Sequence, residues 1–199
     1  MAKKASKNST RTRILDAARI EIVEGNGDLE VANVAKRAGV SDGLTYYHFK
    51  NKSGLINAIV NDFYTHFDDK VAGVQFEGES WAVRERARVY AMVALFYNDP
   101  VAMIAATRLR TDPAFSKEEV ERSDRLEQLG ASNIANAQKK GELSPEFNPL
   151  MLASMLLAGV MSGVRTALTS TPVVPVEQAQ RSVWGFVARA AGLPLLNQD

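Results

Sequence analysis

The sequence of 199 residues contains no cysteine, only two histidines and no long uninterrupted apolar run. Disulfide bonds, thiolate metal sites and cysteine nucleophiles are therefore excluded, and nothing in the chain demands an oxidising compartment. The basic N-terminus lacks the continuous apolar segment of a signal peptide. The most apolar stretch, residues 150–164, is interrupted by serine and glycine and falls short of a transmembrane span. We therefore expect a cytoplasmic protein that has no membrane partner.

A catalytic set is also missing. His66 has carboxylates at helical spacing in Asp62 and Asp69, but such neighbours arise on any exposed helix face. We find no alternating segment long enough for a strand, and hence no strand followed by a phosphate loop or a nucleophile motif. The other histidine, His48, has no second metal-ligating residue at a suitable spacing. The sequence therefore predicts neither an enzyme nor a bound metal or cofactor.

Positive charge is concentrated near the N-terminus, although the net charge of the chain is only +1. Residues 1–52 hold 10 Lys or Arg against 6 Asp or Glu, a balance of +4, whereas residues 53–199 hold 14 against 17, a balance of −3. A polyanion bound through Lys and Arg would favour the N-terminal part, and its binding would weaken with salt. A basic segment is often just a solvated surface, so the charge alone leaves both interpretations open.

Residues 29–52 have the pattern of two short helices joined by a tight turn. Apolar residues recur at helical spacing from Val31 to Ala38, and Gly39 follows them as a helix C-terminal signal. Ser41 is a candidate N-cap for a second helix that extends through Phe49. This arrangement is typical of a helix-turn-helix, whose second helix enters the major groove of DNA.

The same stretch resembles the DNA-binding domain of the tetracycline-repressor (TetR) family of bacterial regulators. The resemblance covers about residues 10–60 and rests on AGVS at 38–41, YYHF at 46–49 and KSGL at 52–55. The family usually has a small and then an apolar residue before the first tyrosine, whereas this chain has Leu44 and Thr45, and either of these could face the core. The resemblance implies a homodimeric repressor that binds a palindromic operator and is released by a small-molecule inducer.

The candidate DNA-binding residues lie on and beside the second helix of this motif. At its start, the Asp42 carboxylate could accept a hydrogen bond from cytosine and the Leu44 side chain could contact a thymine methyl group. Asp42 is equally well explained as a first-turn charge. The resemblance assigns a phosphate contact to Tyr46, and Lys52 at the start of the next helix is a further phosphate candidate. The predicted DNA-binding set is Ser41, Asp42, Gly43, Leu44, Tyr46, Tyr47, His48 and Lys52.

The rest of the chain has helical periodicity, which predicts an all-α fold. We predict a disordered basic arm at residues 1–9, a helix-turn-helix domain at 10–52 and a helical ligand-binding and dimerisation domain at 53–199. Two apolar helices near the C-terminus, residues 150–169 and 176–191, have the character of a four-helix dimer interface. The alternative is that they pack only within one subunit.

An inducer pocket is expected between helices of the larger domain, where ligand sites of helical bundles lie. The same apolar side chains would serve equally well as plain core. Rival functions are an architectural DNA-binding protein without a ligand and a ligand-binding helical protein whose DNA function has decayed. The candidate ligand-binding residues are Tyr90, Met92, Phe96, Met103, Thr107 and Arg108.

Overall fold

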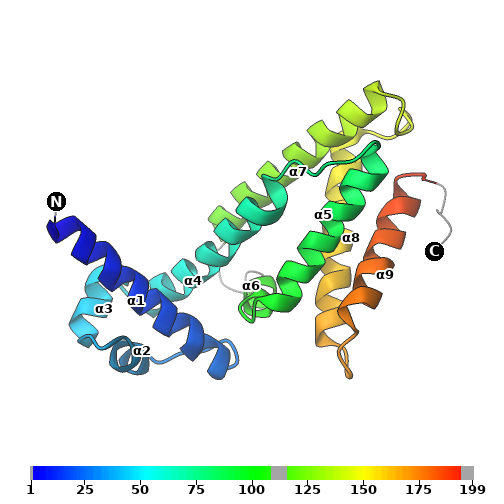
Figure 1. Ribbon diagram of the computed structural model, residues 1–199. Coiled ribbons are helices and arrows are strands. Elements are labelled where there is room, and N and C mark those ends of the chain that lie inside the picture. The colour runs from blue at the N-terminus through cyan, green and yellow to red at the C-terminus, as the bar shows by residue number, and fades with distance from the viewer. Residues whose placement is uncertain (1, 109–115, 194–199) are drawn as a thin grey trace. The chain divides into compact units, whose positions relative to one another are not determined.

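The computed structural model of this chain describes residues 2–108 and 116–193, with the side chains of residues 2–8, 106–108 and 116–119 excepted. Every regular element in the described ranges is helical, so the predicted all-α fold is confirmed (Figure 1). Contacts divide the chain into two units. The first contains the chain up to His66 together with the segment from Pro100, and the second contains Phe67–Asp99 and the residues from Ser116 onward.

The first unit holds the helix-turn-helix. It consists of α1 (Ala2–Glu24), α2 (Val31–Ala38) and α3 (Asp42–Phe49), followed by α4 (Lys52–Phe67), and it also includes α6 (Ala102–Arg108). α1 packs along α2, and α2 packs on α3. Its core is built from buried apolar side chains on the inner faces of the first three helices, which include Ile14, Ala18, Ile22, Val31, Val34, Ala35 and Phe49.

α1 begins within the N-terminal stretch for which the sequence predicts a disordered arm. The helix starts at Ala2, and disorder of residues 1–9 stays a prediction. Alanine and lysine favour a helical backbone, and no glycine or proline separates this stretch from the amphipathic segment after Thr10. The helix therefore continues N-terminally through the basic residues.

The predicted domain boundary at residue 52 also differs from the division by contacts. Most of α4 belongs with the helix-turn-helix, because the Arg19 guanidinium of α1 lies 2.8 Å from the Asp62 carboxylate of α4. Near the start of α4, a Cβ on Gly54 would lie 2.1 Å from the Phe49 carbonyl oxygen, so glycine permits a close approach to α3. The first unit thus extends beyond the predicted boundary.

The second unit is a bundle. A π-helical turn, η1 (Asp68–Ala72), continues from α4, and α5 (Trp81–Asn98), α7 (Ser116–Lys139), α8 (Pro149–Thr169) and α9 (Val176–Ala190) follow. α7 packs on α8, α8 packs on α9, and α5 packs on α9 (Figure 1). The observed bounds of α8 and α9 differ by one residue at most from the predicted ranges 150–169 and 176–191.

α8 is long and apolar enough, by length and composition, to cross a membrane. This corrects the expectation that no segment reaches that length. The core helix of a bundle can be equally long and apolar, and α8 packs against both α7 and α9. Within one chain only 33% of an 18-residue apolar stretch of α8 is buried, so much of the apolar surface of α8 has no cover from its own subunit.

Candidate DNA-binding interface and effector cavity

The turn between α2 and α3 is fixed by local hydrogen bonds. Gly39 ends α2 in the left-handed conformation, with φ of 65°, which costs glycine no Cβ clash. Ser41 caps α3 as predicted, and its hydroxyl oxygen accepts a hydrogen bond from the Leu44 N–H at 3.3 Å. The Arg13 guanidinium of α1 donates to the Ala38 carbonyl oxygen at 2.8 Å. Two short helices therefore stand in a fixed mutual orientation, as a helix-turn-helix requires.

Leu44 and Thr45 take different sides of α3. Thr45 is 1% exposed, and its hydroxyl lies 3.5 Å from the Ser41 carbonyl oxygen, to which it donates. Leu44 is 36% exposed. The alternative left open by the sequence is therefore decided: Thr45 faces the core, and Leu44 is available to a partner molecule.

Most of the predicted DNA-binding residues gather on the exposed side of α3. Ser41, Asp42 and Gly43 are exposed in its first turn, and Tyr46 and Tyr47 are 47% and 65% exposed. His48 is half-buried, and its ring lies 5.4 Å from that of Tyr47 between centroids, in an edge-to-face arrangement. The exposed side therefore offers two phenols and an apolar side chain beside the positive N-terminal end of a helix, which suits contact with both phosphate and base edges.

Lys52 begins α4, but carboxylates already surround its ammonium group. Nζ lies 2.8 Å from Asp28 Oδ1 and 3.6 Å from Glu30 Oε1. The hydrogen bond with Asp28 is the main cause that raises the pKa of Lys52 above its ordinary value, so the side chain is charged at neutral pH. A phosphate would therefore have to share this cation with two carboxylates.

Arg37 of α2 is held in the same way. Its guanidinium contacts Glu21 and Glu24 of α1, each at 2.6 Å. The hydrogen bond with Glu21 is the largest cause of the raised pKa of Arg37. Arg37 is therefore held by carboxylates that the net balance of +4 for residues 1–52 already counts.

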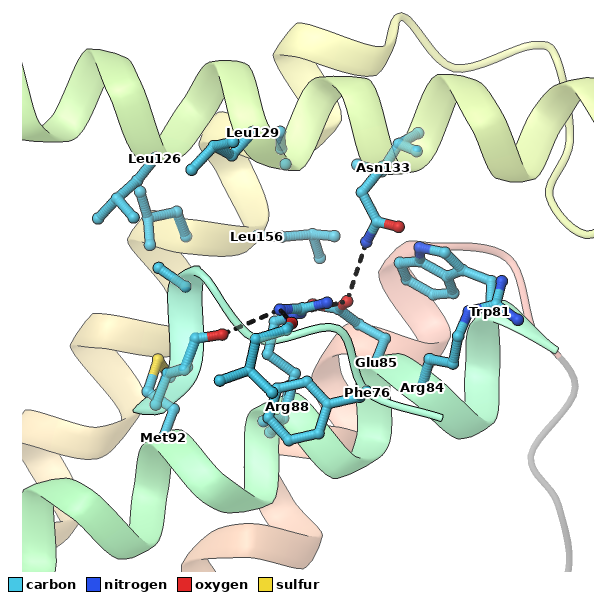
Figure 2. Close-up of a pocket in the computed structure, with 18 of the residues that line it drawn as sticks. Phe76, Trp81, Arg84, Glu85, Arg88, Met92, Leu126, Leu129, Asn133 and Leu156 are labelled. Atoms are coloured by element: carbon cyan, nitrogen blue, oxygen red, sulfur yellow. Dashed lines mark hydrogen bonds and ion pairs between the residues drawn. The ribbon is translucent and has the colours of Figure 1, made fainter. Parts of the chain in front are cut away.

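A cavity of about 600 Å³ lies within the second unit, between η1 with the loop after it, α5, α7 and α8 (Figure 2). We call it the effector cavity and define it by the residues that line it. Its walls are largely apolar, with a polar group near the middle. The principal lining residues are Phe67, Val71, Phe76, Trp81, Arg84, Glu85, Arg88, Met92, Leu126, Leu129, Asn133, Ala153, Leu156 and Val160.

The polar group in the cavity centres on Arg88 of α5. Its Nε donates to Glu85 Oε2 at 3.1 Å, and the Asn133 side chain of α7 donates to the same carboxylate oxygen at 3.1 Å. Nη1 of Arg88 donates to the carbonyl oxygens of Val71 and Val74 at 3.0 and 3.1 Å. Arg88 and Glu85 therefore tie the segment after α4 to α5 and α7.

The structure places only some of the predicted ligand-binding residues at the effector cavity. Met92 lines the effector cavity, whereas Tyr90 and Phe96 lie on the same helix and do not line it. The Phe96 ring packs against Phe67, with 6.3 Å between ring centroids. Met103 lies on α6, which belongs to the first unit, and is not among the lining residues. The side chains of Thr107 and Arg108 lie outside the described part of the structure, and a ligand contact at any of the six stays a prediction.

Arg88, Glu85 and Asn133 are polar lining residues that sequence reasoning missed, and they form one hydrogen-bonded group. Charged residues on an amphipathic helix normally mark its solvent side, so a pattern of apolar periodicity assigns Arg88 and Glu85 outward. The signal that could have found them is their spacing of three residues with opposite charge, which allows an ion pair on one helix face. Such pairs occur on most exposed helices, and their position inside a cavity depends on α7, which lies far away in the sequence.

The candidate His66 set is a local helix contact. Nδ1 of His66 lies 2.9 Å from the Asp62 carbonyl oxygen, one turn earlier, and the side chain is exposed. Within the described residues, no group of three or more His, Asp or Glu side chains is arranged to hold a metal ion.

Residues 14–59 match the family model described as bacterial regulatory proteins, tetR family. Over a longer range the chain is 31% identical to the transcriptional regulator UidR of Escherichia coli strain K12, an alignment of 164 residues that covers 74% of this chain and 76% of UidR. This chain belongs to the TetR family. The regulator BetI of Cronobacter sakazakii is 30% identical over 168 residues, which cover 81% of each chain.

The TetR fold is seen equally in solved structures. The transcriptional regulator FadR from Bacillus subtilis has a TM-score of 0.77 at 18% identity, over 90% of this chain and 98% of that one. The family model and the curated relatives establish a DNA-binding transcriptional regulator with a helix-turn-helix, as the sequence predicts. TetR-family regulators act as dimers, bind DNA operators and respond to small molecules.

Proposed function

We propose that this TetR-family protein is a cytoplasmic repressor whose dimer holds a palindromic operator through α3 and releases it when a small molecule fills the effector cavity. The DNA part rests on one observation above all, the sorting of α3 into a buried and an exposed side. Thr45 and Phe49 complete the core, while Leu44, Tyr46 and Tyr47 contribute little to it. A major groove is the partner whose shape and chemistry suit that exposed side.

In this proposal the predicted residues divide their roles by position on α3. Asp42, Gly43 and Leu44 approach base edges, with the Leu44 side chain against a thymine methyl group. Phosphates receive hydrogen bonds from Ser41, which precedes these three residues, and from the groups that follow them: Tyr46, Tyr47, His48 and Lys52. Lys52 keeps its charge at neutral pH and exchanges part of its contact with Asp28 for a phosphate oxygen.

The dimer would form through α8 and α9. Large apolar side chains on these two helices are exposed in the single chain, notably Met151, Met155 and Phe186. Gly159 lets the Phe186 ring lie close to α8, because a Cβ there would be 2.4 Å from the ring. Two copies of such a helix pair make a four-helix interface, and a two-fold dimer presents two recognition helices to successive major grooves, about 34 Å apart.

The effector part of the proposal is supported by the cavity itself. Its volume and its mostly apolar walls with a few polar groups are those of a small-molecule site. Ligand binding would favour a dimer form in which the two α3 helices no longer match the spacing of the grooves. Operator affinity would then fall by the ratio of the ligand affinities of the two forms.

Selection of bound duplexes from random DNA tests the central claim, and a palindromic site is expected. On that site, Leu44→Ala and Tyr46→Phe should each weaken binding about five- to tenfold, because each removes one direct contact. Tyr97→Phe is the matched control, since Tyr97 lies in the second unit and donates its hydroxyl to the Val174 carbonyl oxygen at 2.8 Å. Salt-dependent binding without a preferred sequence would favour the architectural rival instead.

A further inference from the structure

We infer that the effector cavity selects an uncharged, largely apolar molecule that carries a hydrogen-bond acceptor, such as an ester or ketone oxygen. This inference rests on the proposed function of the cavity as the effector site. Two independent features of the lining residues support it, the balance of charge around the cavity and an unpaired donor on Trp81.

Each arginine in the cavity wall already has a carboxylate partner. Arg88 lies 3.1 Å from Glu85, and Arg84 lies 2.8 Å from Glu142. Both carboxylates are largely buried, with 17% and 19% of their side chains exposed. A bound anion would have to displace one of them and deprive it of its cationic partner, which is costly away from water. The remaining lining cation, Lys140, is exposed to solvent, where water screens it.

The Arg88 guanidinium is also fixed in place by neutral groups. It donates to the carbonyl oxygens of Val71 and Val74, and it lies over the Phe76 ring at 5.0 Å from the centroid. These contacts fix the guanidinium between α5 and the segment after α4. It is therefore poorly placed to swing toward an incoming carboxylate, and a bound cation would meet the same guanidinium as a repulsive charge.

Among the lining residues that the structure describes, Trp81 carries a buried hydrogen-bond donor that a ligand could satisfy. Its side chain lines the cavity and is 1% exposed, and Nε1 has no hydrogen-bond partner among the residues that the structure describes. The backbone N–H of Trp81 is satisfied separately by the Glu142 carboxylate. A buried N–H without an acceptor destabilises the protein, and an oxygen of a bound molecule would satisfy it.

The other lining residues indicate the length and polarity of the rest of the ligand. Figure 2 shows Trp81 beside Asn133 at one end, and Leu126, Leu129 and Met92 toward the other. Trp81 and Met92 lie about three turns apart on α5, so a molecule that reaches both is about 16 Å long. An acceptor at the Trp81 end and an aliphatic or aromatic body toward Met92 match this arrangement.

Three probes of equal chain length test the charge preference: methyl nonanoate, nonanoate and nonylammonium. Titration calorimetry on the full-length dimer should give a dissociation constant for methyl nonanoate about tenfold or more below that of either ion. Equal or tighter binding of nonanoate or nonylammonium would overturn the inference. So would the failure of the folded protein to bind the ester.

A substitution at Trp81 tests the donor. Trp81→Phe keeps an aromatic ring but removes Nε1, so methyl nonanoate should bind about fivefold more weakly. The melting temperature of the ligand-free variant combines two opposing effects, the loss of an unpaired donor and the smaller volume of phenylalanine at a buried site, so the ester affinity carries the test. Trp184→Phe is the matched control, since Trp184 lies on α9 and does not line the cavity. Unchanged ester affinity in Trp81→Phe would refute the assigned role of Nε1.

Operator release separates this inference from the proposed function. If methyl nonanoate binds through Trp81 but leaves the operator complex intact at saturation, the ligand class stands and the effector role of the cavity is wrong. If nonanoate binds more tightly and releases the operator, the effector role stands and the ligand class is wrong.

Discussion

Leu44 and Thr45 are consecutive residues of α3, yet Leu44 is 36% exposed while Thr45 is 1% exposed. Successive residues of a helix point about 100° apart, so one of the two can complete the core while the other meets a partner. Thr45 also donates its hydroxyl to the Ser41 carbonyl oxygen one turn earlier. In the proposed function, folding and operator recognition therefore depend on different members of this pair.

Aspartate at these two positions should separate the two functions. Thr45→Asp buries an unpaired carboxylate and should lower the free energy of unfolding by about 3 kcal/mol. Leu44→Asp should change that free energy by less than about 0.5 kcal/mol, because the side chain is exposed, but it should abolish tight operator binding. Urea denaturation and fluorescence anisotropy measure the two effects. Similar losses of stability in both variants would contradict the assignment of the two faces.

The helix-turn-helix was predictable because its signals are local. Gly39 ends α2 and Ser41 caps α3 through backbone groups within four residues of themselves, so their identities suffice to place the turn. Local spacing could not decide between Leu44 and Thr45, because threonine can be buried when its hydroxyl bonds back to the preceding turn. That outcome depends on the packing of α2 against α3.

The effector cavity was much less predictable, because it depends on residues that are distant in the sequence. Glu85 becomes an inner residue through Arg88 on its own helix and Asn133 on α7. The sequence predicts Met92 and Met103 for one pocket, but Met92 lines the cavity whereas Met103 belongs to the first unit. Helical periodicity gives the buried side of one helix at a time, and a cavity is defined by several helices together.

Two glycines of the first unit should respond oppositely to alanine. A Cβ on Gly54 would lie 2.1 Å from the Phe49 carbonyl oxygen, so Gly54→Ala forces α4 away from α3 and should cost about 1–3 kcal/mol. A Cβ on Gly43 meets no heavy atom within 4 Å, and Gly43→Ala in α3 should stabilise the fold by about 0.5–1 kcal/mol. Thermal denaturation distinguishes the signs. Destabilisation of equal size by both changes would show that α3 and α4 are not packed as described.

The environment of Lys52 predicts a dependence of DNA binding on salt. Lys52→Met should reduce the slope of log affinity against log salt by about one, the amount expected for one lost phosphate contact. Asp28→Asn should have the opposite effect on affinity, because it frees the ammonium group from the carboxylate at 2.8 Å. Anisotropy titrations at several salt concentrations measure both. Identical slopes for Lys52→Met and the unchanged protein would remove Lys52 from the DNA-binding set.

The same ion pair should contribute little to stability. Both side chains are exposed, at 39% for Lys52 and 61% for Asp28, so solvent screening leaves about 0.5 kcal/mol or less. Because the folded-state pKa of Lys52 is raised, this contribution is fully present below the ordinary lysine pKa of 10.5 and is lost as pH rises through the raised value. Unfolding experiments near neutral pH should therefore find Lys52→Met almost as stable as the unchanged protein.

The dimer interface can be tested with two exposed apolar residues that differ in location. Met155 lies on α8 and is 54% exposed in the single chain, whereas Val120 lies on α7 and is 57% exposed. If α8 and α9 pair with their copies, Met155→Glu places two carboxylates in an apolar interface and should shift the protein to monomer. Val120→Glu should leave the dimer intact. Light scattering coupled to size-exclusion chromatography reads the mass directly.

Operator binding should depend on dimer formation. A monomer presents one recognition helix and gains nothing from the second half-site, so Met155→Glu should weaken operator binding by about two orders of magnitude or more, although α3 itself is unchanged. Circular dichroism should show full helical content, because Met155 contributes little to the core of its own chain. A dimer that persists in Met155→Glu, or one that dissociates in Val120→Glu, would place the interface on a surface other than α8 and α9.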